Sequence, residues 1–277
     1  MGRADLHTHT TASDGAAEPA DLVRMAYENR LELLSITDHD TIDGYLEARE
    51  EAATLPIQLI PGIELTTLWQ GRELHLLGYG FDPADSAFMK LLVSQRRARK
   101  DRIGVITHRL QKLGLDVDPD EVFAVAGRSM PGRPHVARVL TKKGYTGSVH
   151  EAFVRYLGNE VMGSLDLFWV HLEAASEAVR GAGGVVVIAH PGRTCTYEEV
   201  EEMCNDRIDG IECIHPSHGY DHQLRYTRMA ERWGLLVSGG SDFHGSGTHE
   251  AGSRFGTVTV ESGRAERILQ RCSSVPE

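Results

Sequence analysis

The chain has 277 residues, and 29 Lys and Arg against 40 Asp and Glu give a formal net charge of −11. Its composition is ordinary for a globular protein, and its length allows one large domain or one domain with an insertion. No apolar run reaches the roughly 18 residues of a membrane span, and the first residues show no apolar signal region. The acidic balance argues against a protein that coats nucleic acid. Four cysteines without CxxC spacing indicate reduced thiols, so we expect a cytoplasmic protein.

Short apolar runs, bounded by Gly, Pro or polar turns, predict buried strands along most of the chain. They lie at residues 4–6, 33–36, 57–60, 74–77, 185–188, 210–214, 235–237 and 258–260. Helical patterns fall between several of them, at residues 19–29, 42–53, 172–180, 198–203 and 222–232. Alternation of strands and helices predicts a mainly parallel sheet, either open or closed into a barrel.

Residues 85–178 break this alternation, because they show helical patterns and no clear strand. The patterns lie at residues 88–113, 120–126 and 134–143. We therefore expect a helical insertion at 85–178 in an α/β body formed by residues 1–84 and 179–277.

The insertion is basic: residues 96–143 hold twelve Lys and Arg against five Asp and Glu, a net charge of +7. A basic insertion on an acidic body indicates that the insertion faces an anionic ligand. One basic cluster could instead be a solvated helix face that binds no ligand. It consists of Arg96, Arg97, Arg99, Lys100 and Arg102. The later segment at 128–135 is punctuated by Gly and Pro, so we interpret it as a loop with arginines suited to phosphate.

Side chains that can bind metal follow, or lie within, nearly every predicted strand. They are His7, His9, Asp14, His39, Glu64, His75, His190, Asp242 and His244. Because the carboxyl ends of parallel barrel strands meet on one face, we expect these side chains to converge. Imidazole and carboxylate suit Zn, Mn and Fe, and so many ligands exceed the needs of one ion. The sequence therefore predicts two or three divalent metal ions.

Other histidines carry weaker expectations. His215 and His218 follow the strand at 210–214 and could support the site or act as acids. Asp38 could orient a ligand histidine. We interpret His108, His150 and His171 as ordinary surface or packing residues. The roles of His222 and His249 are left undecided.

The chain closely resembles the PHP (polymerase and histidinol phosphatase) family. The segments DLHTHTTASDG, SITDHDT, PGIE, LHLLGY, IAHPGR and GGSDFHG match its motifs in order, over residues 1–80 and 182–262. Within the family, GRPHVARVL and IECIHPSH resemble the TrpH/YciV-type branch of bacterial phosphoesterases. The resemblance implies a distorted (β/α)7 TIM-like barrel with a helical insertion and up to three metal ions, most often Mn, with Fe or Zn as alternatives.

The resemblance also distributes the metal ligands. It implies a first ion held by His7, His9, Glu64 and Asp242. It implies a second ion held by Glu64, His75 and His190. It implies a third ion held by Asp14, His39 and His244.

The branch that the chain resembles is similar to enzymes that remove the 3′-phosphate of nucleoside 3′,5′-bisphosphates. The resemblance therefore implies phosphomonoester hydrolysis by a metal-activated water. Arg193 would lie near the metals, and His218 or His215 would protonate the leaving alkoxide. The residues expected to bind a second phosphate are Arg128, Ser129, Arg133 and His135.

Several alternatives remain open. Family members also trim short RNA from the 5′ end, and others are histidinol-phosphate phosphatases, although the basic insertion favours a substrate with more negative charge. An amidohydrolase is disfavoured because Lys is absent from the predicted strands. A non-catalytic or polymerase-associated module is disfavoured by the complete ligand set. We expect a small phosphorylated nucleotide or short RNA as partner, and neither long duplex DNA nor a membrane; the sequence indicates no oligomeric state.

Overall fold

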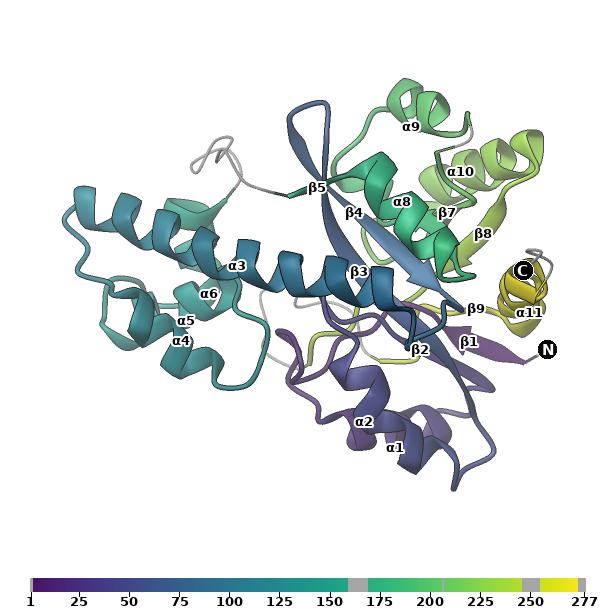
Figure 1. The fold of residues 1–277 in the computed structure, drawn as a ribbon, viewed down its shortest axis with the longest axis horizontal. Coiled ribbons are helices and arrows are strands. Elements are labelled where there is room, and N and C mark those ends of the chain that lie inside the picture. The colour runs from purple at the N-terminus through teal and green to yellow at the C-terminus, as the bar shows by residue number, and fades with distance from the viewer. Residues whose placement is uncertain (1, 159–168, 206, 246–254, 274–277) are drawn as a thin grey trace.

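The computed structural model describes residues 2–158, 169–205, 207–245 and 255–273. Within these ranges a mixed sheet curves into a nearly closed barrel (Figure 1). Its strands lie in the order β8-β7-β6-β4-β3-β2-β1-β9, with β5 beside β3. The strands are β1 (Arg3–Asp5), β2 (Leu33–Ile36), β3 (Gln58–Trp69), β4 (Arg72–Tyr79), β5 (Val170–His171), β6 (Val185–Ile188), β7 (Gly210–Ile214), β8 (Leu236–Gly239) and β9 (Val260–Glu261).

Helices cover the outside of the sheet and form the insertion (Figure 1). They are α1 (Pro19–Glu28), α2 (Asp43–Ala52), α3 (Ser86–Lys112), α4 (Pro119–Ala126), α5 (Arg133–Lys142), α6 (Val149–Ala152), α8 (Leu172–Gly181), α9 (Tyr197–Met203), α10 (Tyr220–Trp233) and α11 (Ser262–Ser273). The described residues also include a π-helical turn, Phe153–Leu157, and a 3-10 turn, Pro191–Arg193. Local sequence explains several starts: Pro19 occupies the first turn of α1, and Asp118 with Glu121 forms a capping box on α4. Among the described helices, none is both long and apolar enough to cross a membrane.

The expectation of a mainly parallel sheet holds for most of the described strand pairs, but the centre of the sheet and the pair β1–β9 are antiparallel. β3 and β4 form an antiparallel hairpin, and β4 pairs antiparallel with β6. The hairpin turns at Gln70 and Gly71, whose positive φ angles of 47° and 76° allow a tight reversal. β3 also continues to Trp69, well beyond the predicted end at residue 60, so that Glu64 lies inside a strand and not after one. The parallel pairs expected elsewhere are present: β1 with β2, β2 with β3, β6 with β7, and β7 with β8.

Backbone hydrogen bonds close the barrel between its first and last parallel strands. Leu6 N donates to Gly239 O at 3.3 Å, and Asp242 N donates to His7 O at 2.8 Å. His9 N then donates to Phe243 O at 2.9 Å. The seam of the barrel therefore runs through segments that carry predicted metal ligands.

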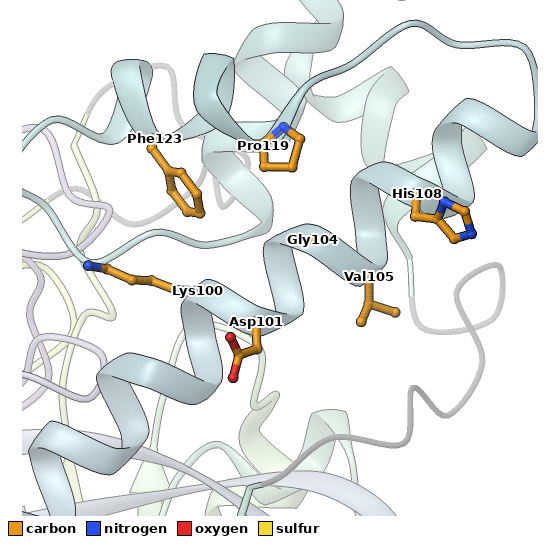
Figure 2. A pocket seen from close by; sticks show the side chains of 7 residues that line it. All are labelled: Lys100, Asp101, Gly104, Val105, His108, Pro119 and Phe123. Atoms are coloured by element: carbon orange, nitrogen blue, oxygen red, sulfur yellow. The ribbon is translucent and has the colours of Figure 1, made fainter.

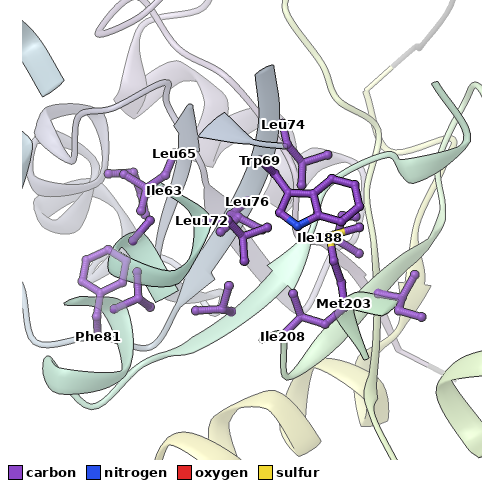
Figure 3. Close-up of a cluster of buried hydrophobic side chains, with 14 of the residues drawn as sticks. Ile63, Leu65, Trp69, Leu74, Leu76, Phe81, Leu172, Ile188, Met203 and Ile208 are labelled. Atoms are coloured by element: carbon purple, nitrogen blue, oxygen red, sulfur yellow. The ribbon is translucent and has the colours of Figure 1, made fainter. Parts of the chain in front are cut away.

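The region predicted as an insertion contains its own apolar core. Side chains of α3, α4 and α5, among them Ile106, Val122 and Leu140, form one buried cluster. The short strand β5 also lies in this region and pairs with β3, which the sequence did not indicate. The boundary at residue 178 stays a prediction, although α8, which spans it, packs its Leu172 against the barrel cluster of β3, β4 and β6 (Figure 3).

The outer side of the insertion carries a groove of about 590 Å³ between α3 and α4 (Figure 2). Its lining residues are Lys100, Asp101, Gly104, Val105, His108, Pro119 and Phe123. None of them belongs to the predicted metal site. The basic cluster of α3 is not one solvated face, because Arg99 and Arg102 are buried whereas Arg96 and Arg97 are exposed.

Candidate metal centre

Four buried candidate ligands meet just beyond the carboxyl end of β1. His7 Nε2 lies 3.2 Å from Glu64 Oε2 and 3.2 Å from Asp242 Oδ1. His9 Nε2 lies 3.1 Å from the same Glu64 oxygen and 3.2 Å from the same Asp242 oxygen. Residues two apart in extended chain point to the same side, which explains how both histidines reach these carboxylates. One donor atom from each of the four lies within 4.8 Å of the others.

A second group shares His9 with the first. It contains His9, Asp14, His39 and His244, whose donor atoms also lie within 4.8 Å of one another. His244 Nε2 is 3.4 Å from Asp14 Oδ1, and His39 Nε2 is 3.9 Å from Asp14 Oδ2. The structure thus brings together the residues expected around a third ion.

A third group consists of His39, Glu64 and His75. His75 Nδ1 lies 2.7 Å from Glu64 Oε1, and His190 Nε2 lies 3.0 Å from the same oxygen. All nine predicted ligands therefore surround a common centre in which Glu64 belongs to two groups. How they divide among particular ions stays a prediction.

The chemistry of this donor set fits divalent cations. Both ring nitrogens of His9, and the Nδ1 atoms of His39 and His190, are buried without a hydrogen-bond partner. Such orphaned groups are costly unless something binds them, and a cation would use their lone pairs. Burial opposes protonation of His75, but Glu64 and Glu73 outweigh it and raise the pKa of His75 to about 9. This preference for positive charge is what a metal ion would satisfy.

Glu212, on β7, is a part of the site that the sequence analysis missed. Its Oε1 lies 2.8 Å from His7 Nδ1, and its Oε2 accepts a hydrogen bond from His190 N at 2.6 Å. Burial would raise the pKa of Glu212, but His7 and His215 hold it below its usual value. The carboxylate thereby directs the other nitrogen of His7 toward Glu64. The available signal was a single charged residue inside an otherwise apolar strand.

Asp38 acts on a loop and not directly on an imidazole. It accepts hydrogen bonds from Thr10 N at 2.8 Å, Thr10 Oγ1 at 2.7 Å and Ser13 Oγ at 2.6 Å. These bonds hold the loop that carries Asp14. We expected Asp38 to orient a ligand histidine, but its hydrogen bonds orient this loop instead.

The two candidate acids differ in how their nitrogens are used. His218 Nδ1 lies 3.1 Å from Cys213 O, and its Nε2 accepts from Gly192 N at 3.1 Å. Because both nitrogens are engaged by backbone and burial lowers its pKa, His218 is a neutral structural bridge, and its geometry does not support the acid role. In His215, by contrast, Nδ1 accepts a hydrogen bond from Ser217 N at 3.0 Å. The proton of the neutral ring therefore lies on Nε2, which is 3.2 Å from Asp242 Oδ2.

Of the residues expected to bind substrate, Arg193 lies beside the metal groups. Its Nη1 is 3.7 Å from Asp242 Oδ2. Arg133 is one step further away, because it pairs with Glu73 at 3.1 Å, and Glu73 lies 3.4 Å from His75 Nε2.

The other expected substrate residues have different surroundings. Arg128 is 67% exposed and pairs with Glu18 and Glu47 at the surface. Ser129 Oγ donates to Thr11 O at 2.5 Å, which fastens this loop to the barrel. His135 is 1% exposed, accepts Gly132 N at 3.2 Å and has a pKa lowered by burial to about 4, so it is a neutral cap of α5 and not a phosphate ligand.

Comparison with known proteins agrees with this geometry. The chain is 36% identical over 245 residues to a 5′-3′ exoribonuclease of Haemophilus influenzae, covering 87% of this chain and 89% of the relative. It is 34% identical to a 3′,5′-nucleoside bisphosphate phosphatase of Chromobacterium violaceum, covering 89% of each. Among solved structures, a proposed metal-dependent phosphoesterase from Bifidobacterium adolescentis superposes with a TM-score of 0.87 at 31% identity, covering 97% of this chain and 96% of that one.

The PHP domain family matches residues 5–206, which include most of the assembled donors. The expected family, the distorted TIM-like barrel and the hydrolysis of phosphate esters are thereby confirmed. The chain belongs to the PHP domain family and is a metal-dependent phosphoesterase.

Proposed function

We propose that this phosphoesterase removes the 3′-phosphate of nucleoside 3′,5′-bisphosphates, for example converting adenosine 3′,5′-bisphosphate to AMP and phosphate. The observation that carries the proposal is that arginines from two elements reach two different metal groups. Arg193 lies 3.7 Å from Asp242, and Arg138 on α5 donates to the backbone oxygen of Asp14 at 3.4 Å. A small substrate with two phosphates can use both arginines at once. The bisphosphate phosphatase from C. violaceum supports this substrate class.

The chain's own residues support each part of the reaction. Water adds to phosphorus, the bond from phosphorus to O3′ breaks, and O3′ takes up a proton. Divalent metal ions, when bound, would activate the water and neutralise phosphate charge. His215 would act as the acid in its imidazolium form: with Nδ1–H donated to Ser217 Oγ at 2.7 Å, its Nε2 proton, beside Asp242, would pass to O3′ and leave a neutral ring. Arg193, beside the same carboxylate, would bind the phosphoryl oxygens.

Exonucleolytic cleavage of short RNA from its 5′ end is the second candidate. It is favoured by the relative in H. influenzae. The bond broken is again the one between phosphorus and O3′ of a 5′-phosphorylated nucleotide. The two substrates therefore differ in whether the scissile phosphate carries a further nucleoside.

Product release from four substrates in Mn²⁺ tests the proposal: adenosine 3′,5′-bisphosphate, 3′-AMP, 5′-AMP and a 5′-phosphorylated adenosine dinucleotide. A charged hydrogen bond contributes about 1.5–3 kcal/mol, so we expect the bisphosphate to react roughly 10- to 100-fold faster than 3′-AMP. Arg138→Met should remove this preference. Lys142→Met, at the exposed end of the same helix, should leave it intact.

Equal rates on the bisphosphate and on 3′-AMP would refute a second phosphate site. Cleavage of the dinucleotide faster than the bisphosphate would replace the proposal with the exoribonuclease. Release only from 5′-AMP would exclude both candidates.

A further inference from the structure

Helix α3 presents three long polar side chains to the barrel, although it leaves the sheet to enter the insertion (Figure 1). Gln95, Arg99 and Arg102 are spaced by four and three residues, which places them on one face of the helix. Their exposed fractions are only 1%, 6% and 8%. A buried guanidinium requires a partner, so these arginines have a function inside the protein.

Arg99 grips the carboxylate that follows a predicted metal ligand. Its Nε donates to Asp40 Oδ2 at 2.5 Å and its Nη2 donates to Thr66 Oγ1 at 2.8 Å. Asp40 is fully buried, has a positive φ of 53° and comes directly after His39. Its own N–H donates to Glu64 O at 2.9 Å. Arg99 therefore holds a strained backbone position between two donors of the metal centre.

Arg102 reaches a different ligand through Glu73. Its Nη2 donates to Glu73 Oε2 at 2.6 Å, and Arg133 of α5 donates to Glu73 Oε1 at 3.1 Å. Glu73 and His75 are two residues apart on β4 and point to the same side. His75 Nε2 lies 3.4 Å from Glu73 Oε1, while its Nδ1 lies 2.7 Å from Glu64. One carboxylate thus connects two insertion helices to this histidine.

Trp169 covers both arginines. The Arg99 and Arg102 guanidinium carbons lie 5.8 Å and 5.1 Å from the centre of its ring, and the side chain is almost fully buried. The Arg99–Asp40 pair is thereby shielded from water, which strengthens it, whereas the Arg102–Glu73 pair is only partly shielded because Glu73 keeps 16% of its side chain exposed.

We propose that α3 is a positioning helix for one metal group, the one formed by His39, Glu64 and His75. Arg99 fixes the first histidine through the carboxylate next to it, and Arg102 fixes the second through the carboxylate two residues before it. The inference rests on the third group described above, in which these three side chains would share one ion, and not on the division among ions that the family resemblance implies. Since outer partners of ligands typically change metal affinity by about 10- to 100-fold, removing either link should weaken one bound ion selectively.

Metal-free protein dialysed against a series of buffered Mn²⁺ concentrations, with bound manganese counted by mass spectrometry, tests this. Glu73→Gln keeps the volume of the side chain and removes its charge. Arg99→Lys keeps the positive charge and loses the two-atom grip. In each variant we expect one equivalent of Mn²⁺ to bind at least about tenfold more weakly, with the others unchanged and the metal-free protein still folded.

Two further variants make the result interpretable. Arg96→Lys alters an exposed arginine of the same helix, which pairs with Asp43 in solvent, and should bind Mn²⁺ as the wild type does. His75→Ala should lose the same equivalent that Glu73→Gln weakens; full binding by His75→Ala would overturn the ligand assignment and the inference with it.

The role of α3 is overturned separately from the ligand assignment if His75→Ala loses one equivalent while Glu73→Gln and Arg99→Lys bind Mn²⁺ normally. It is overturned as well if both variants weaken every equivalent alike, or lose their fold before metal is added. Any of these three results would mean that the contacts of α3 stabilise the fold without positioning one metal group.

Discussion

The buried imidazole of His135 makes the stability of the protein sensitive to mild acid. The side chain lies in α5, is 1% exposed and accepts a hydrogen bond from Gly132 N at 3.2 Å. Burial, only partly opposed by Asp14, lowers its pKa from the ordinary 6.5 to about 4. The folded protein therefore keeps this ring neutral over a range in which the unfolded chain protonates it.

The sign follows from proton linkage. Below pH 6.5 the unfolded chain binds a proton that the folded protein refuses until about pH 4. The contribution of neutral His135 to the free energy of unfolding is therefore complete above pH 6.5, and it is lost as the pH falls from 6.5 toward 4. Between pH 7.5 and 5.0 the linkage relation gives a loss of about 2 kcal/mol in the free energy of unfolding.

Urea unfolding of the metal-free protein at these two pH values measures the effect. His135→Gln keeps an acceptor for Gly132 N but cannot be protonated. We expect its loss of stability between pH 7.5 and 5.0 to be about 2 kcal/mol smaller than that of the wild type. His108→Gln, which changes an exposed histidine of α3, should behave like the wild type. The same loss in all three proteins would refute the reasoning.

Four further predictions concern the site and its frame. Glu212→Gln should lower metal affinity or kcat by about 10- to 100-fold, measured by dialysis and phosphate release, because it weakens the bond that orients His7. Gly240→Ala should destabilise the protein by about 1–3 kcal/mol in urea, since a Cβ there would lie 2.4 Å from His7 N. Gly104→Ala, in the open groove of Figure 2, should instead stabilise it by up to about 1 kcal/mol, as nothing lies within 4 Å of the new Cβ. Chelation of metal should lower the thermal midpoint of the wild type, since ions at 100 times their Kd stabilise the folded state by about 2.7 kcal/mol, and an unchanged midpoint would contradict this.

The position of the donors was predictable because barrel topology turns sequence order into proximity. Ligands placed near strand ends had to meet wherever the strands were parallel. The central hairpin was not predictable in the same way, because Pro61 and Gly62 interrupt the apolar pattern near the start of β3. Glu64 therefore seemed to follow a strand, whereas the strand runs on past it to Trp69.

Buried charges account for most of what the sequence did not reveal. From composition alone, Arg99 and Arg102 seemed to belong to a basic surface. In the fold, they instead form ion pairs with Asp40 and Glu73, respectively. Glu212 was hidden for the converse reason, since a single carboxylate in a strand acquires a role only when His7 is brought beside it. Partnership between charges far apart in the chain is a tertiary property that composition and spacing do not encode.

The seam between β1 and the segment after β8 gives the metal centre a mechanical role. His7 and Asp242 come from opposite ends of the sequence, and their segments are joined by the backbone hydrogen bonds that close the barrel. Any ion shared by these two side chains is a cross-link across this closing edge of the barrel. Opening the seam and releasing that ion are then one event, so amide hydrogen exchange at His9 and Asp242 should report on metal binding as directly as an assay of the ion itself.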